Sequence, residues 1–141
     1  MQWDSSPNGG FTDASAKPWM TINKDYTDWN VASQIDDPES IMAYWKQMIG
    51  LRKEYSDLFV YGSYTSMDES ETGEMVVGYE RTWSQTGQKA AVLLNFSDQI
   101  QTVPVEKYEG FSILISNDGR IDPAKNQVEL QPYGAVVFLN A

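Results

Sequence analysis

The segment Met75 to Phe96, MVVGYERTWSQTGQKAAVLLNF, decides the fold of the second half of the chain. Two runs of strand-forming residues, 75–83 and 90–96, flank the turn-forming residues Ser84-Gln85-Thr86-Gly87. Apolar runs on both sides of a short turn that contains glycine are typical of a β-hairpin. The segment therefore predicts two neighbouring antiparallel strands.

Short apolar runs continue on both sides of this hairpin. The run 100–103 alternates and then meets Pro104, which ends a strand or places it at a sheet edge. The acidic residues 68–73 predict a solvated turn, and Asn117-Asp118-Gly119 predicts a hairpin turn. Further strands are predicted at 59–61, 64–67, 111–115, 128–130 and 136–139. Short strands with regular turns predict an antiparallel β-sandwich domain over residues 58–141.

A helix is predicted over residues 37–55, before the strands. Asp37 is a suitable N-cap and Pro38 a suitable first helical residue. Arg52 and Lys53 fall in the last turn, where the helix dipole favours cations. A broad apolar stripe follows helical spacing at Ile41, Tyr44, Trp45, Met48, Ile49, Leu51 and Tyr55. A stripe of this width requires a large partner surface.

Residues 1–37 predict a long irregular loop. The run 5–10, SSPNGG, is dense in turn formers, and large apolar residues then recur without a helical or strand period. A free linker is small and polar, so this loop must lie against something. Trp19, Trp29 and Trp45 are expected in the core or in packing between domains.

Composition excludes several classes of function. Ten basic residues face twenty acidic ones, a net charge of −10, which disfavours nucleic acid and anionic membranes as partners. The chain has neither His nor Cys, so thiol chemistry, a Ser-His-Asp triad and ordinary zinc sites are not expected. We expect no cofactor and no metal. No apolar run is long enough to span a bilayer, and a cytoplasmic location is the default expectation.

The opening residues 1–12, MQWDSSPNGGFT, closely resemble a segment of the maltases and oligo-1,6-glucosidases of glycoside hydrolase family 13. The resemblance continues in register along the whole chain. It includes residues 16–19 (AKPW), 22–23 (IN), 30–31 (NV), 37–40 (DPES), 44–46 (YWK), 51–53 (LRK), 60–62 (VYG) and 94–97 (LNFS).

This resemblance implies a (β/α)₈ barrel followed by an antiparallel C-terminal domain. Residues 1–57 would be a remnant of the barrel: a loop on its active-site side and its last helix. Residues 58–141 would be the C-terminal β-domain. The family reaction is retaining hydrolysis of an α-glucosidic bond by two carboxyl groups. The family's catalytic residues lie upstream of the matched region, so we assign no catalytic residue to this chain.

The opening loop holds the candidates for contact with an oligosaccharide substrate. Aromatic faces stack on sugar C–H groups, while amide and carboxylate side chains bind hydroxyl groups. The candidates are Gln2, Trp3, Asp4, Asn8 and Phe11. The alternative is structural: the two rings pack, and Asp4 and Asn8 hold turns. Tyr79 and Trp83, which share one strand face, have the same two interpretations.

Three functions remain open on these residues. The first is the C-terminal part of an α-glucosidase, inactive alone, whose partner is the missing barrel portion. The second is a carbohydrate-binding or protein-interaction β-domain without catalysis. The third is descent from the maltase-like subunits of amino-acid transporters, which the lack of a membrane segment in this sequence disfavours. Carboxylate pairs such as Asp36 with Asp37 or Asp25 with Asp28 lack any sign of the burial that raises a carboxyl pKa.

Overall fold

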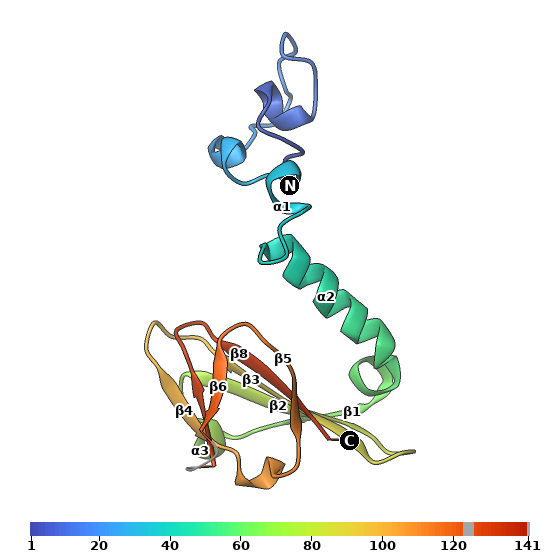
Figure 1. Ribbon diagram of the computed structural model, residues 1–141, viewed down its shortest axis with the longest axis vertical. Coiled ribbons are helices and arrows are strands. Elements are labelled where there is room, and N and C mark those ends of the chain that lie inside the picture. The colour runs from blue at the N-terminus through green and yellow to red at the C-terminus, as the bar shows by residue number, and fades with distance from the viewer. Residues whose placement is uncertain (123–125, 141) are drawn as a thin grey trace. The chain divides into compact units, whose positions relative to one another are not determined.

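The computed structural model divides the chain into two compact units, Met1–Glu54 and Tyr55–Ala141 (Figure 1). It describes residues 1–122 and 126–140.

The first unit is built from short helical turns. The 3₁₀ turns η1 (Pro7–Gly10) and η2 (Lys24–Thr27) precede the one-turn helix α1 (Val31–Gln34). Asn30 starts α1 with a capping box, because its side chain accepts from the Ser33 amide at 2.9 Å. The amides of Val31 and Ala32 donate to the carbonyls of Gln2 and Trp3. These bonds tie the N-terminal strand of loop to α1.

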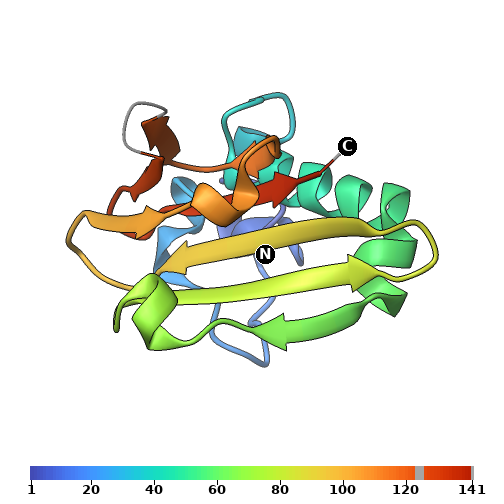
Figure 2. The same cartoon turned by 90° about the horizontal axis from the view of Figure 1, so that it is seen from below.

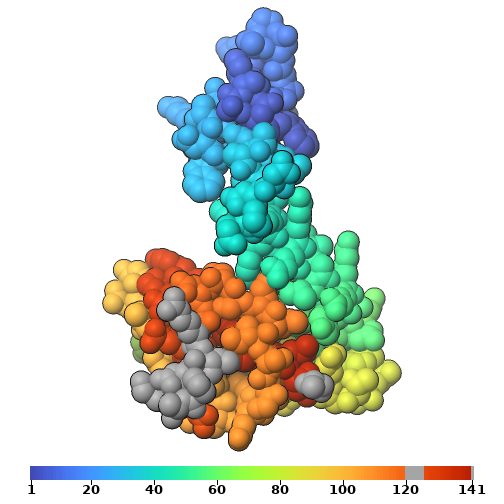
Figure 3. Space-filling view, viewed as in Figure 1, coloured from blue at the N-terminus to red at the C-terminus, as the bar shows by residue number. Residues whose placement is uncertain are grey.

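Helix α2 (Ile41–Glu54) confirms the predicted helix but begins later than expected. The N-cap prediction for Asp37 is wrong: Ser40 Oγ accepts from the Ala43 amide at 3.1 Å. Asp37 and Pro38 lie in a turn before the helix, in which Asp37 Oδ1 accepts from the Glu39 amide. No residue of α2 is buried. Ile41, Trp45 and Ile49 of the predicted stripe are exposed, and side chains along the helix stand out into open space (Figure 3).

The second unit contains two antiparallel sheets. The larger has the order β1-β2-β3-β8-β5, and Figure 2 shows β1, β2 and β3 side by side. Its strands are β1 (Ser63–Ser66), β2 (Val76–Trp83), β3 (Gln88–Asn95), β8 (Ala135–Leu139) and β5 (Ser112–Ser116). The hairpin predicted from 75–96 is confirmed, with Val76 opposite Asn95 and Trp83 opposite Gln88.

The smaller sheet has the order β4-β7-β6. Its strands are β4 (Gln101–Pro104), β7 (Gln127–Leu130) and β6 (Gly119–Asp122). Pro104 closes β4 at the edge of this sheet, as predicted. The hairpin turn predicted at Asn117–Gly119 is wrong, because β5 and β6 pair in different sheets.

One core joins the two sheets. Val76, Ala91, Leu93, Val136 and Phe138 come from the larger sheet, and Val103, Val128 and Leu130 from the smaller. Tyr108, from the 3₁₀ turn η4 (Glu106–Tyr108), stacks on Phe138 with ring centroids 6.0 Å apart. Apolar burial of this kind is the main stabilising term of a small domain.

Two short segments of the second unit are helical where strands or turns were predicted. Residues 59–61 lie in the π-helical turn η3 (Asp57–Tyr61), whose Leu58 is fully buried. The Arg81 guanidinium donates to the carbonyls of Leu58 and Val60 at 3.3 and 3.2 Å, which satisfies backbone groups that a strand would have paired. The acidic segment 68–73 forms the short helix α3 (Glu69–Thr72), begun by a capping box of Asp68 and Glu71.

Candidate functional site

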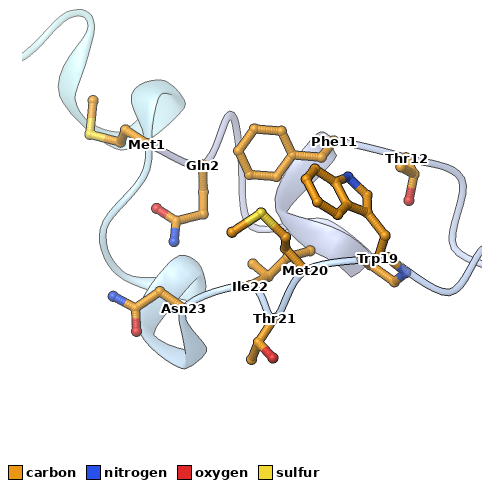
Figure 4. A pocket seen from close by; sticks show the side chains of 10 residues that line it. Met1, Gln2, Phe11, Thr12, Trp19, Met20, Thr21, Ile22 and Asn23 are labelled. Atoms are coloured by element: carbon orange, nitrogen blue, oxygen red, sulfur yellow. The ribbon is translucent and has the colours of Figure 1, made fainter.

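A cavity of about 500 Å³ lies in the first unit. Figure 4 shows the rings of Phe11 and Trp19 on one side of it, the amides of Gln2 and Asn23 on the other, and Met20 and Ile22 between them. Its walls are mostly apolar, with a few polar groups. This is the usual composition of a site for a small organic molecule.

Left-handed backbone in η1 brings Gln2 and Phe11 to the same cavity. Asn8, Gly9 and Gly10 all have positive φ, between 60° and 73°. The Trp3 amide donates to the Gly9 carbonyl at 2.9 Å, which folds the turn back onto the chain start. A Cβ at Gly9 would lie 3.1 Å from Gln2 Cγ. Glycine is therefore required there, both for its φ and for the approach of Gln2.

Asp4 and Asn8, two of the predicted contact residues, hold the loop and do not line the cavity. The carboxylate of Asp4 accepts from the Ser6 hydroxyl and from the Ser6 amide, and these bonds lower the pKa of Asp4 below its ordinary value. The Asn8 amide donates to the carbonyls of Asp13 and Ala16 at 2.8 and 3.1 Å. Their side chains serve the turns of the loop.

The structure brings together only part of the predicted set. Gln2 and Phe11 line the cavity, while Trp3 is exposed outside it. Trp19, expected in a core or between domains, is 93% exposed and lines the cavity; Trp29 and Trp45 are also exposed, so none of the three belongs to a core of the described chain. Sequence reasoning missed Met20, Ile22 and Asn23, because they lie beyond the opening motif and have no periodic pattern.

The carboxylates of the described residues form no catalytic pair that we can recognise. Glu80 is the least exposed carboxylate in an ion pair. Burial opposes its ionisation, but the Tyr108 hydroxyl at 2.8 Å and the ammonium groups of Lys89 and Lys107 outweigh burial and lower the pKa of Glu80. A permanently ionised, hydrogen-bonded group of this kind stabilises structure and is a poor general acid.

Within residues 1–122 and 126–140, no three acidic side chains come close enough to hold a metal ion. Over the same residues, no helix is long and apolar enough to cross a membrane.

The family description "Alpha amylase, catalytic domain" matches residues 1–62. An α-glucosidase of Schizosaccharomyces pombe is 39% identical over 139 residues, which are 98% of this chain and 23% of the relative. An oligo-1,6-glucosidase of Bacillus cereus is 36% identical over 142 residues, 98% of this chain and 24% of the relative. The chain belongs to glycoside hydrolase family 13. It spans about a quarter of the length of the curated relatives it matches.

Solved structures of the family agree with this assignment. A trehalulose synthase superposes with a TM-score of 0.82 at 30% identity, over 98% of this chain and 24% of that one. An isomaltulose synthase of Erwinia rhapontici, solved with its natural substrate sucrose, gives 0.80 at 30% identity, over 99% and 24%. The similarity covers both units. These family members include glucosidases and sugar synthases, so the family alone does not define one reaction.

Proposed function

We propose that this chain is the C-terminal part of an α-glucosidase, and that it is inactive alone. The parent enzyme would hydrolyse α-glucosidic bonds in oligosaccharides of the maltose or isomaltose type with retention of configuration. The observation that carries the proposal is the match to α-glucosidases and oligo-1,6-glucosidases over 98% of this chain and about a quarter of theirs.

In this proposal residues 1–57 are a remnant of the catalytic (β/α)₈ barrel, and residues 58–141 are its C-terminal antiparallel β-sandwich domain. The match of a catalytic-domain family to residues 1–62 supports the first assignment. The two sheets that share one core support the second. The exposed stripe of α2 also supports the missing barrel portion as the partner, since a barrel helix packs its apolar face on the barrel.

The cavity between Phe11, Trp19 and Gln2 is the proposed contribution of this chain to substrate binding. A sugar ring could stack on either aromatic face while the Gln2 and Asn23 amides bind its hydroxyl groups. Trp3, Asp4 and Asn8 remain in the proposal as the neighbouring residues that hold this loop. None of these residues is proposed to act as nucleophile or acid.

The proposal is tested by activity with and without the missing portion. The purified chain should show no turnover of maltose or p-nitrophenyl α-glucoside. A chimaera, in which this chain replaces the matching region of the Bacillus cereus oligo-1,6-glucosidase, should hydrolyse the chromogenic substrate. Turnover by the chain alone, or a folded chimaera without turnover, would contradict the proposal.

The cavity also favours a second candidate, a binding module without catalysis. Calorimetry of the chain with maltooligosaccharides distinguishes the two. Heat at millimolar sugar that disappears in a Trp19→Ala variant would favour a free-standing binding module. The fragment proposal expects weak or no heat, because the remaining walls of the site would be missing.

A further inference from the structure

Strands β2 and β3 carry apolar side chains on both faces. The inner face supplies Val76 and Leu93 to the core. On the opposite face Val77 lies across from Leu94, and the Phe96 amide donates to the Met75 carbonyl at 2.9 Å. An antiparallel sheet with one face in water alternates apolar and polar residues. This hairpin breaks that alternation, so its outer face is suited to burial.

The outer row extends to a third strand. Leu94 pairs with Ala135 of β8, and the Asn95 amide donates to the Gly134 carbonyl at 2.8 Å. Continuing this register places Tyr133 across from Phe96. We call Met75, Val77, Phe96 and Tyr133 the outer patch. All four are exposed, and Phe96 and Tyr133 are each 66% exposed.

Tyr133 is held in this position against a backbone cost. Its φ is 57°, a left-handed value that costs a residue with a side chain on the order of 1 kcal/mol. Asn117 holds the turn: its amide donates to the Tyr133 carbonyl at 3.2 Å, and its oxygen accepts from the Ala135 amide. The exposed ring contributes nothing to the core of its own unit. Strain that is stabilised by neighbours while the ring points to solvent indicates a contact outside this chain.

We propose that the outer patch is the docking surface for the catalytic barrel of the parent enzyme. This inference rests on the proposed function, and it names the surface through which the β-domain holds the barrel. The curated relatives supply the occupant, because this chain covers only 23–24% of their length. A protein surface fits the mixture of Met, Val and aromatic side chains, which are enriched in the dry centre of interfaces or common in cores.

A glucan fits the outer patch less well. A sugar site needs polar groups free to bind hydroxyls beside the aromatic faces. The amides nearest the patch are already engaged: Asn95 donates to the carbonyls of Gln99, Leu130 and Gln131, and Asn117 is bound at both of its polar atoms. The Ser97 hydroxyl donates to Asn95 Oδ1 at 2.8 Å.

The test compares one double variant, Phe96→Ser with Tyr133→Asn, in two settings: the chain alone and the chimaera with the Bacillus cereus enzyme. Asn tolerates a positive φ, so the turn is preserved. Ile113→Ser is the matched control, since Ile113 is an exposed apolar residue of edge strand β5 outside the patch.

Thermal unfolding is the readout. The double variant should lower the midpoint of the chimaera by about 3 °C or more while leaving the midpoint of the chain alone unchanged within 1 °C. Ile113→Ser should act equally in both settings. An equal shift of the double variant in both settings, or none in the chimaera, would overturn the inference. So would maltooligosaccharide binding by the chain that the double variant abolishes. Activity of the chimaera tests the proposed function separately, because unfolding is measured whether or not the chimaera turns over substrate.

Discussion

The two units of this chain use their apolar residues in opposite ways. In the second unit the side chains of Leu93, Leu130 and Phe138 are enclosed by two sheets. In the first unit Trp19 and Trp45 are exposed, and α2 has no buried residue at all. Composition does not separate the units, since both are rich in large apolar residues. The difference is whether the partners of those residues lie in this chain.

This difference shows that a sequence can fully specify a local structure without containing its packing partner. Helix α2 has its cap at Ser40, and α1 has its capping box at Asn30. The hydrogen bonds at helix ends are therefore satisfied inside the first unit. Tertiary packing of an amphipathic face provides most of the stability of a helix, and that contribution is missing here.

The largest expected effect is in the core of the second unit. Leu93→Ala should lower the free energy of unfolding by about 3–5 kcal/mol, because it removes a fully buried side chain and leaves a cavity. Urea denaturation followed by tryptophan fluorescence and far-ultraviolet circular dichroism measures this loss. A cost below about 1 kcal/mol would mean that the core is loosely packed and that the two units differ less than the structure indicates.

The next effect concerns Asn95, which joins the two sheets. Its amide is buried and donates to the carbonyls of Gln99 and Gln131 at 2.8 and 2.9 Å. Asn95→Ala should cost about 1–3 kcal/mol, because these carbonyls lose a buried donor. The neighbouring Asp98→Ala, at an exposed residue, is the control and should change stability by less than about 0.5 kcal/mol. Equal effects of the two substitutions would contradict this role for Asn95.

Acid should weaken the second unit through Glu80. The pKa of Glu80 is lowered in the folded state, so its contribution is present above the ordinary pKa of 4.5 and is lost as pH falls through the folded pKa. Glu80→Gln should cost about 1 kcal/mol at pH 7, and its stability should fall less steeply below pH 4.5 than that of the wild type. Denaturant titrations at several pH values measure both slopes. Parallel pH profiles for variant and wild type would show that Glu80 does not carry the effect.

The smallest effect is expected on α2. Trp45→Ser should change the unfolding free energy of the chain by less than about 0.5 kcal/mol, because Trp45 has no buried contact to lose. In the chimaera with the Bacillus cereus enzyme the same substitution should cost about 2 kcal/mol or more, as the burial of a large aromatic residue would predict. A large loss in the chain alone would mean that α2 already has its partner.

The strands of the second unit were largely predictable, because their period of two and their turns are local signals. Residues 59–61 could not be placed, because a three-residue apolar run fits a strand or a turn of helix. The long-range bonds from Arg81 to the Leu58 and Val60 carbonyls decide for the π-helical turn. The fate of Asn117 was equally hidden, because its side chain binds the segment before β8 and so separates β5 from β6.

Contacts distant in sequence also decided the start of α2. Asp37 and Ser40 are both good N-caps, three residues apart. Buried Gln34 selects Ser40, since the Gln34 carbonyl accepts from Ser40 Oγ at 2.9 Å and its side chain accepts from the Met42 amide. In the candidate site the opening motif identified Gln2 and Phe11. Trp19 was missed as a cavity residue, because a tryptophan in an irregular loop has no signal that separates packing from binding.

Native-state hydrogen exchange of the intact chain tests the contrast between the units most directly. Exchange protection reports the free energy of opening at each amide. The account predicts strong protection, close to the global unfolding free energy, at Ala91, Leu93 and Phe138, and weak protection at Trp45, Met48 and Ile49 of α2. Equal protection in the two groups would contradict the claim that this chain holds one self-sufficient unit and one that awaits the rest of a barrel.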